Sequence, residues 1–292
     1  MVDSVAADVV CRVIEERDLT KVVDCLERGF PERPRAFWTD GLAHLAARPQ
    51  IGDLPRFGHL LAAGETVVGV LLQIMSTREA VEGRYVRCNM AGWCVDPNYL
   101  GYGHPLHARA ISRREVVYFT VTPAPHTLPT LAAVGYRRYS EGQIIFAPLL
   151  SRGEPGARVV AYRPDRPEAA LLTTSDARLL ADHSALGCTA FIGLSGGEAR
   201  PLVFQPRRIW RALIPCVHLI YCRDPGDLAR FAPSYGRQLA RHGRFVVVAD
   251  AVGPVPGLAG RYFAKREPRY YKGPRPPSPC DLADTELVIF GR

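Results

Sequence analysis

The chain has 292 residues, of which 47% are hydrophobic and 23% charged, and its formal net charge is +8. This composition is typical of a globular protein with one large or two ordinary domains, and it excludes a disordered chain. Apolar runs such as 67–75 are too short to cross a bilayer, and the acidic N-terminus lacks the order of a signal peptide. We therefore expect a cytoplasmic protein with no membrane partner.

The positive charge comes almost entirely from arginine, since lysine occurs only at positions 21, 265 and 272. The arginines are scattered apart from one basic stretch at 261–275, which suits an anionic ligand and does not identify a nucleic acid. The eight cysteines include no Cys-x-x-Cys pair. This spacing predicts buried free thiols in a reducing compartment and no metal site.

Hydrophobic periodicity predicts a mixture of helices and strands in the first half of the chain. Asp18 is expected to cap the first helix, and Gly64-Glu65 to form a hairpin turn. The expected elements, in chain order, are a strand at 9–14, helices at 19–29 and 36–47, strands at 57–63, 66–75 and 85–95, a helix at 104–113, a strand at 115–121, a helix at 127–134 and a strand at 139–149.

The second half begins after a segment rich in glycine, proline and arginine at 151–167, which we interpret as a linker. Asp224 followed by Pro225 is a good helix start, and Pro233 is expected to kink that helix. The basic and aromatic segment at 260–279 is expected to be a loop. The other expected elements are a helix at 176–186 and strands at 188–194, 201–204, 214–222, 244–249 and 286–290.

The most informative segment is 93–104, which reads Trp-Cys-Val-Asp-Pro-Asn-Tyr-Leu-Gly-Tyr-Gly-His. Its two glycines lie between an expected strand and an expected helix, where glycine permits a tight turn and leaves no Cβ in the way of a ligand. The free N–H groups at the helix start, together with the helix dipole, form an anion site. A phosphate-bearing cofactor is the ligand that this pattern favours.

Two motifs, and the distance between them in the sequence, resemble those of the GNAT superfamily of acyl-CoA-dependent N-acyltransferases. Residues 95–103 are similar to its V-x-P-x-[YH]-[RQ]-G-x-G cofactor motif, and residues 130–136 to its later L-Y-E-K-x-G-F segment. The resemblance covers residues 9–149, about half of the chain. It implies an α/β (α+β) GNAT fold with a mixed, mostly antiparallel central sheet flanked by helices.

The order of strand, helix and strand after residue 168 echoes the cofactor half of the first domain, but the glycine turn is missing. Asp224 and Asp227 stand where an anion would bind. We therefore expect a GNAT-like acyl-CoA-binding domain at 1–150, a linker at 151–167 and a degenerate GNAT-like domain at 168–292 that forms the acceptor cleft. Such tandem arrangements resemble mycothiol synthase, N-myristoyltransferase and the Fem peptidyl transferases.

The resemblance implies that the cofactor is acetyl-CoA or another acyl-CoA. Its pantetheine amides would pair with the strand edge at Trp93, Cys94 and Val95. Its pyrophosphate would be held by the backbone N–H groups of Leu100, Gly101, Tyr102, Gly103 and His104. Leu100 departs from the family, which usually has arginine or glutamine there, so one side-chain donor is lost.

Catalytic residues are harder to assign, because Leu131 stands where many relatives have the acidic tyrosine. The strand at 85–95 also lacks the usual glutamate base and offers Arg87, Asn89 and Trp93. The substitutes are His126, because histidine is the side chain most suited to acid–base work near neutral pH, and a backbone N–H near Cys94 or Val95 for the oxyanion. The Cys94 thiol and the carboxylate of Arg292 are further candidates.

The favoured function is the transfer of an acyl group, expected to be acetyl, from acyl-CoA to an amine of a small molecule or peptide. One alternative is a non-catalytic acyl-CoA sensor, which the leucine at 131 favours. Another is a Fem-like transferase in which the basic aromatic segment holds an aminoacyl-tRNA, the one nucleic acid considered as a partner. The sequence leaves the acceptor, the acyl length and the oligomeric state open.

Overall fold

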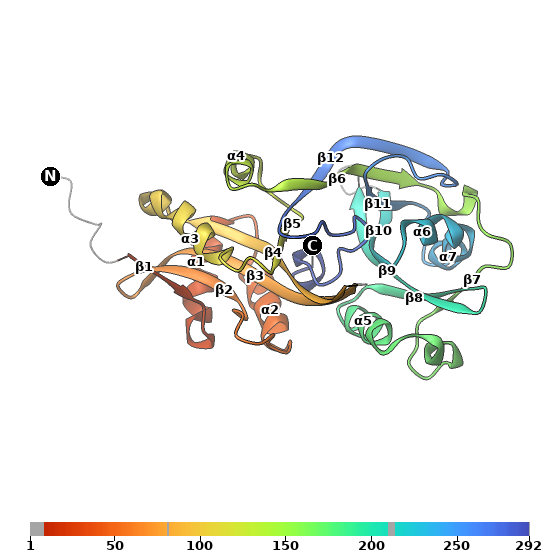
Figure 1. Cartoon of the computed structure of the whole chain (residues 1–292), viewed down its shortest axis with the longest axis horizontal. Helices are drawn as coiled ribbons and strands as arrows, with labels where there is room; N and C mark the ends of the chain where they lie inside the picture. Colours follow the sequence, from red (N-terminus) through yellow and green to blue (C-terminus); the bar gives the residue numbers. More distant parts are fainter. Residues whose placement is uncertain (1–8, 81, 210–213, 292) are drawn as a thin grey trace. The chain divides into compact units, whose positions relative to one another are not determined.

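The computed structural model describes residues 9–80, 82–209 and 214–291 (Figure 1). These residues form two compact units. Unit 1 takes residues 9–137 with two later segments, 270–276 and 284–291, and unit 2 takes the described part of 138–269 with 277–283. The units differ from the predicted domains, because the chain leaves unit 1 within the strand β6 and later returns to it twice.

Unit 1 is built on a sheet in the order β1-β2-β3-β4-β5, and the end of β12 pairs with β5. All neighbouring strands are antiparallel except β4 and β5, which are parallel. The predicted mixed, mostly antiparallel sheet is confirmed. The strands are β1 (Val9–Val13), β2 (Gly58–Ala63), β3 (Thr66–Ala80), β4 (Gly83–Val95), β5 (Val117–Thr120) and the last three residues of β12 (Gly260–Lys272).

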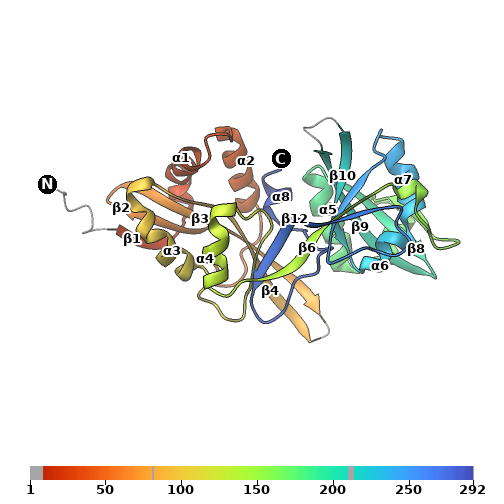
Figure 2. The same ribbon diagram turned by 90° about the horizontal axis from the view of Figure 1, so that it is seen from above.

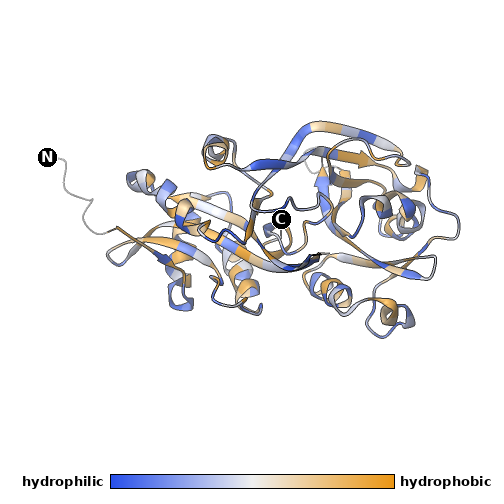
Figure 3. Cartoon of the chain, in the orientation of Figure 1, coloured by the Kyte–Doolittle hydropathy of each residue, from blue (hydrophilic) through white to orange (hydrophobic). Residues whose placement is uncertain are grey.

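Helices cover both faces of this sheet, with α1 and α2 on one side and α3 on the other (Figure 2). The helices are α1 (Leu19–Gly29), α2 (Arg35–Ala46), α3 (Gly103–Ala110), α4 (Leu128–Ala133) and α8 (Glu286–Ile289). Adjacent residues of β3 serve the two faces: Leu71 packs in the cluster that contains Leu106 of α3, and Leu72 lies towards Leu26 of α1. This explains why residues 67–75 of β3 are largely apolar without alternation. Figure 3 colours the chain by the hydropathy of each residue.

Unit 2 has a sheet in the order β12-β6-β11-β10-β9-β8-β7. The β10 and β11 strands are parallel, and the pairs β6–β11, β10–β9, β9–β8 and β8–β7 are antiparallel. Its core gathers around Phe204, Phe231 and Tyr235. Its strands are β6 (Arg137–Phe146), β7 (Arg158–Ala161), β8 (Thr189–Ser195), β9 (Glu198–Ile209), β10 (Ile214–Cys222), β11 (Val247–Ala251) and the greater part of β12. Its helices are α5 (Thr174–Ala185), α6 (Pro225–Arg230) and α7 (Ala232–Ala240).

Three local predictions are wrong. Asp18 does not cap α1, because its carboxylate accepts hydrogen bonds from Arg12 at 2.5 and 2.7 Å and from the Glu15 N–H at 2.9 Å. The interpretation of 151–167 as a linker misses β7, which pairs with β8. The helix expected to kink at Pro233 is two separate helices, α6 and α7, divided at Phe231.

Two further segments differ from the expected structure. The basic segment at 260–279 begins with the long strand β12. Two of its charged residues, Lys265 (φ 64°) and Glu267 (φ 45°), have left-handed backbone. The strand expected at 286–290 is the helix α8. Its short apolar run is buried, and periodicity alone does not separate a buried strand from a buried helical turn.

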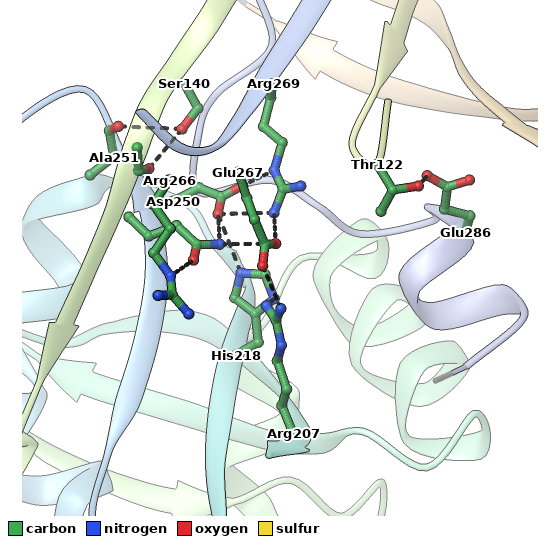
Figure 4. A network of polar contacts seen from close by, with 12 residues as sticks. Thr122, Ser140, Arg207, His218, Asp250, Ala251, Arg266, Glu267, Arg269 and Glu286 are labelled. Carbon is green, nitrogen blue, oxygen red and sulfur yellow. Dashed lines mark hydrogen bonds and ion pairs between the residues drawn. The ribbon is translucent and has the colours of Figure 1, made fainter. Parts of the chain in front are cut away.

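A buried ionic network lies in unit 2 (Figure 4). The Asp250 carboxylate on β11 accepts from the Arg269 guanidinium on β12 at 2.6 and 3.2 Å, and from the Gln143 side chain on β6 at 2.9 Å. His218 on β10 lies 3.4 Å from the same carboxylate. Burial raises the pKa of Asp250, but the Arg269 charge and the His218 contact outweigh it and hold that pKa well below its usual range.

Candidate active site in unit 1

The strands β4 and β5 diverge at the centre of unit 1. Their parallel pairing runs only from Arg87 and Val117 to Asn89 and Phe119. Beyond Asn89, β4 continues for six residues while β5 ends at Thr120. The two strands therefore diverge after Asn89, and the backbone of β4 beyond that residue has no ladder to β5.

A β-bulge lies just after the point of divergence. Ala91 pairs with Leu72 and Cys94 pairs with Val70, so Gly92 and Trp93 face a single residue of β3. Gly92 has φ +52°, the left-handed region that favours glycine. A bulge leaves backbone groups of the bulged strand unpaired and turns them away from the ladder. The bulge thus lies at Gly92 and Trp93, one to three residues before the predicted Cys94 or Val95.

A cavity of about 560 Å³ opens beside the bulge and is lined by residues of unit 1 alone. This volume lies within the range of about 300–1,000 Å³ that is typical of small-molecule sites. Its walls come from β4 at the bulge, from the ends of α1 and β5, and from α2, α3, α4 and α8. The divergence of β4 and β5 therefore opens onto a space that can hold a small molecule.

The predicted anion-binding loop follows β4 as a 3₁₀ turn, Pro97–Tyr102, which leads directly into α3. Arg28 anchors the start of this loop, because its guanidinium donates to both carboxylate oxygens of Asp96 at 2.8 and 3.2 Å. At Gly101 a Cβ would meet no atom within 4 Å, and at Gly103 it would make ordinary contact with Val95. The loop therefore leaves open space at its glycines.

The prediction that Gly101 and Gly103 are glycines because the chain makes a tight turn there is wrong. Gly103 has φ −60°, and Gly101 is not among the left-handed glycines. Both positions have ordinary backbone, so the absence of a Cβ matters only for the approach of another group. Leu100 is 67% exposed, so its side chain does not pack in the core. Tyr102 is half-buried, and His104 is exposed at the first turn of α3.

The Cys94 side chain faces away from the cavity, towards α1. A Cβ at Gly29 of α1 would lie 2.5 Å from the Cys94 Cβ, which shows how closely the two backbones pack. The neighbouring Cys25 and burial raise the pKa of the Cys94 thiol far above its usual value. A thiol in this state carries almost no thiolate, so the prediction of Cys94 as a nucleophile is not supported by its surroundings.

His126 and Leu131 both line the cavity, so the structure brings together two residues that the sequence singled out. His126 is exposed on a 3₁₀ turn (Pro125–Thr127), and Leu131 is buried on α4. The leucine therefore occupies the wall where the resemblance expects an acidic tyrosine. The carboxylate of Arg292, the other candidate, lies outside the described residues.

Glu286 is a cavity residue that the sequence did not identify. It is half-buried at the start of α8, and its carboxylate accepts a hydrogen bond from the Thr122 hydroxyl (Figure 4). Its backbone N–H donates to the Asn89 side-chain oxygen at 2.7 Å. Asn89 stands on the strand where the family often has its base, and here its side-chain oxygen holds the backbone of a residue that lies 197 positions further along the chain.

His107 on α3 is a second cavity residue that sequence reasoning missed. Its ring stacks on Trp93 with 5.0 Å between centroids, and its Nε2 lies 3.4 Å from the Tyr136 hydroxyl. Its Nδ1 is buried and has no partner among the described residues. Burial, with smaller effects from the charges of His104 and Lys272, lowers the pKa of His107 to about 4. The ring is therefore neutral at neutral pH.

This lowered pKa predicts acid sensitivity. The unfolded chain binds a proton on His107 at pH values where the folded chain does not, so stability falls as pH drops from 6.5 towards 4. The loss from this residue is at most about 3 kcal/mol. Urea denaturation at pH 7 and at pH 4.5 measures it, with His107→Phe as the comparison because phenylalanine keeps the stack on Trp93. An unchanged pH dependence in this variant would contradict the assignment.

The equivalent divergence in unit 2 is filled by the chain itself. Beyond its two pairs with β11, the edge of β10 bonds to a later segment: the Cys222 N–H donates to the Cys280 carbonyl at 3.0 Å, and the Leu282 N–H donates to the Ile220 carbonyl at 2.7 Å. Asp224 caps α6 by accepting from the Gly226 N–H. Between β10 and α6 an anion therefore finds neither a free strand edge at Ile220 and Cys222 nor an uncapped helix start.

Within the described ranges, no three histidine, cysteine or carboxylate groups lie together as metal ligands. The eight cysteines all lie in the described residues and form no disulfide with one another. No helix in the part of the chain that the structure describes has the length and hydrophobicity to span a membrane.

No known protein family and no curated protein matches the sequence. Solved structures do match the fold. A GCN5-related N-acetyltransferase from Anabaena variabilis has 11% sequence identity and a TM-score of 0.59, over 91% of this chain and 72% of that one.

A GCN5-related N-acetyltransferase from Kribbella flavida has 15% identity and a TM-score of 0.56, over 91% and 72% of the two chains. Eis1 from Mycobacterium abscessus has 12% identity and a TM-score of 0.55, over 91% and 73%. At these identities the likeness concerns architecture, and the chain has the fold of the GCN5-related N-acetyltransferases.

Proposed function

We propose that unit 1 binds acyl-CoA and transfers its acyl group to an amine. The observation that carries this proposal is the divergence of β4 from β5, with a bulge at Gly92 and Trp93 that opens onto the cavity. An unpaired strand edge can bond the amides of an extended ligand, as an added strand would. The fold, which is that of known N-acetyltransferases, supports the same reading.

The residues fit an acyl-CoA donor. The edge at Trp93, Cys94 and Val95 would pair with pantetheine, and the backbone N–H groups from Leu100 to His104 would hold the pyrophosphate. The open space at Gly101 suits a close approach of phosphate oxygens to the backbone. Leu100 contributes no donor, so this cradle depends on main-chain groups alone.

When bound, acyl-CoA supplies an activated thioester carbonyl. The unpaired backbone at Gly92 and Trp93 would donate to the carbonyl oxygen as negative charge develops there. His126, on the cavity wall, is the proposed acid for the departing thiol, because Leu131 has no proton to give. The acyl group is expected to be acetyl.

Calorimetric titration with acetyl-CoA and with a longer acyl-CoA tests this proposal, followed by a free-thiol assay on the same sample. We expect saturable binding of acetyl-CoA and slow thiol release that rises when amines are added. Dephospho-CoA, which retains the pyrophosphate, should bind, whereas pantetheine should bind much more weakly. The absence of binding to either acyl-CoA would refute the cofactor site.

Leu131 supports one alternative, a protein that binds acyl-CoA without turning it over, since its apolar side chain lies in the cavity wall where relatives have an acid. Binding without thiol release on any amine would favour that sensor. The tRNA-dependent alternative stays a prediction. Its basic segment is largely within β12, where Arg269 is buried against Asp250 and Arg266 donates to Gln143.

We also infer that unit 2 is a degenerate copy of unit 1, as the sequence predicts. The support is that both sheets repeat one pattern: four antiparallel strands, a parallel neighbour, and an antiparallel strand after it. In each unit the fourth strand is irregular soon after the parallel pairs, at Gly92 in β4 and near Ile220 in β10. The acceptor cleft predicted for 168–292 remains a prediction.

A further inference from the structure

We propose that the acceptor is a primary amine carried on an aromatic or similarly flat apolar group, and that Glu286 takes the proton from this amine. This inference rests on the proposed function and names the substrate class of the same cavity. It comes from two features of the cavity wall, which are a cluster of aromatic rings and a single inner carboxylate.

Four aromatic rings from three segments form one part of the wall: Phe30, Phe37, Trp38 and Phe290, which we call the aromatic wall. Trp38 is at the centre of this cluster, with ring centroids 5.3 Å from Phe30, 4.9 Å from Phe37 and 5.7 Å from Phe290. The contacts with Phe37 and Phe290 are edge-on. Such rings favour a flat apolar guest through contact area and edge-to-face packing.

The charged groups of the cavity are unevenly distributed. Glu32 and Arg33 are exposed, and the Arg33 guanidinium lies over the outer ring of Phe37 at 4.8 Å. Glu286 is half-buried and is held from two sides, because Thr122 donates to its carboxylate and Asn89 accepts from its backbone. The two histidines of the wall are His107, neutral at neutral pH, and His126. Glu286 is therefore the carboxylate best fixed to meet an ammonium group.

The reaction balances with these groups. The ammonium loses one proton to Glu286, and the free amine nitrogen bonds to the carbonyl carbon while the C–S bond breaks. The sulfur leaves as the free thiol with a proton from His126, and the second amine proton replaces the proton that His126 gave. Glu286 releases its proton to water, so the products are an amide, CoA and one proton. No oxidant, reductant or metal is required. A fixed carboxylate that accepts a proton in this way is worth about 10²–10⁴ in rate.

An amine panel with acetyl-CoA as the donor tests the substrate class. We expect kcat/KM for 2-phenylethylamine and tryptamine to exceed that for putrescine and glucosamine at least tenfold. Equal values, or a preference for the polar amines, would overturn the inference while leaving acyl transfer intact. If acetyl-CoA fails to bind, the proposed function fails, and the inference falls with it.

A variant of Glu286 and a variant of a control carboxylate test the role of Glu286. In Glu286→Gln we expect kcat to fall about 100-fold with 2-phenylethylamine while the affinity for acetyl-CoA, measured by calorimetry, stays the same. The matched control is Glu115→Gln, an exposed carboxylate of unit 1 outside the cavity, which should remain within threefold. A rise in KM with unchanged kcat would show that Glu286 only binds the amine, and an unchanged rate would remove it from the site altogether.

Discussion

Replacing Asp250 by asparagine is expected to lower the free energy of unfolding by about 3–5 kcal/mol, the range for a buried ion pair that loses one partner. The Arg269 side chain is 1% exposed. Its guanidinium would then face a neutral amide, whose NH2 group brings donors that the carboxylate lacks. Gln143, which donates to the same carboxylate, would lose its acceptor or compete for the one that remains. Denaturation by urea at pH 7 measures the change.

The matched control is Glu141→Gln. Glu141 pairs with Arg138 at 3.3 Å on the exposed face of β6, with both side chains nearly half exposed. Exposed ion pairs are worth about 0–1 kcal/mol, so this variant should scarcely change stability. If Asp250→Asn were no more damaging than the control, the network would be a set of weak contacts and not a requirement of the unit 2 core.

Replacing Gly101 by tryptophan is expected to weaken acetyl-CoA binding at least 100-fold, which corresponds to about 2.7 kcal/mol. The large side chain would occupy the space through which phosphate oxygens reach the loop backbone. The fold should tolerate the change, because a Cβ at this position meets no atom within 4 Å and the backbone is not left-handed. Calorimetry measures the affinity, and circular dichroism checks the fold.

Gly253 provides a matched control, since it also has open space around its Cβ and ordinary backbone, but lies in unit 2. Gly253→Trp should bind acetyl-CoA as the unchanged protein does. Equal affinities in all three proteins would show that the loop at 97–104 is an ordinary turn, and the assignment of the cofactor site would then be lost.

The sequence predicted the sheet of unit 1 well, because its strands carry local signals. The unbroken apolar run of β3 comes from packing on both faces, and Gly64-Glu65 gave the hairpin to β2. The loop motif was found for a related reason, since strand, turn and helix follow one another there without a break. The roles of the loop residues remain predictions.

The rest depended on contacts between distant residues. Glu286 reaches the cavity through a hydrogen bond with Asn89, and nothing near either residue in the sequence indicates the other. Gly92 did carry a signal, because a glycine inside a strand often marks a bulge. The sequence did not predict β12, because its many charged residues are typical of a solvated loop. Only the structure shows that Arg269 has a buried partner, Asp250, and that Lys265 and Glu267 have left-handed backbone.

The division of unit 1 among three stretches of chain has a consequence for biosynthesis. Domains generally fold in order as they emerge from the ribosome. Residues 9–137 can assemble the strands β1 to β5 early, but the strand that closes beside β5 and the helix that carries Glu286 are translated only after the whole of 138–269. A nascent chain therefore holds the glycine loop before it holds a complete cavity, and the order of synthesis keeps the site unfinished until residues 284–291 have been made.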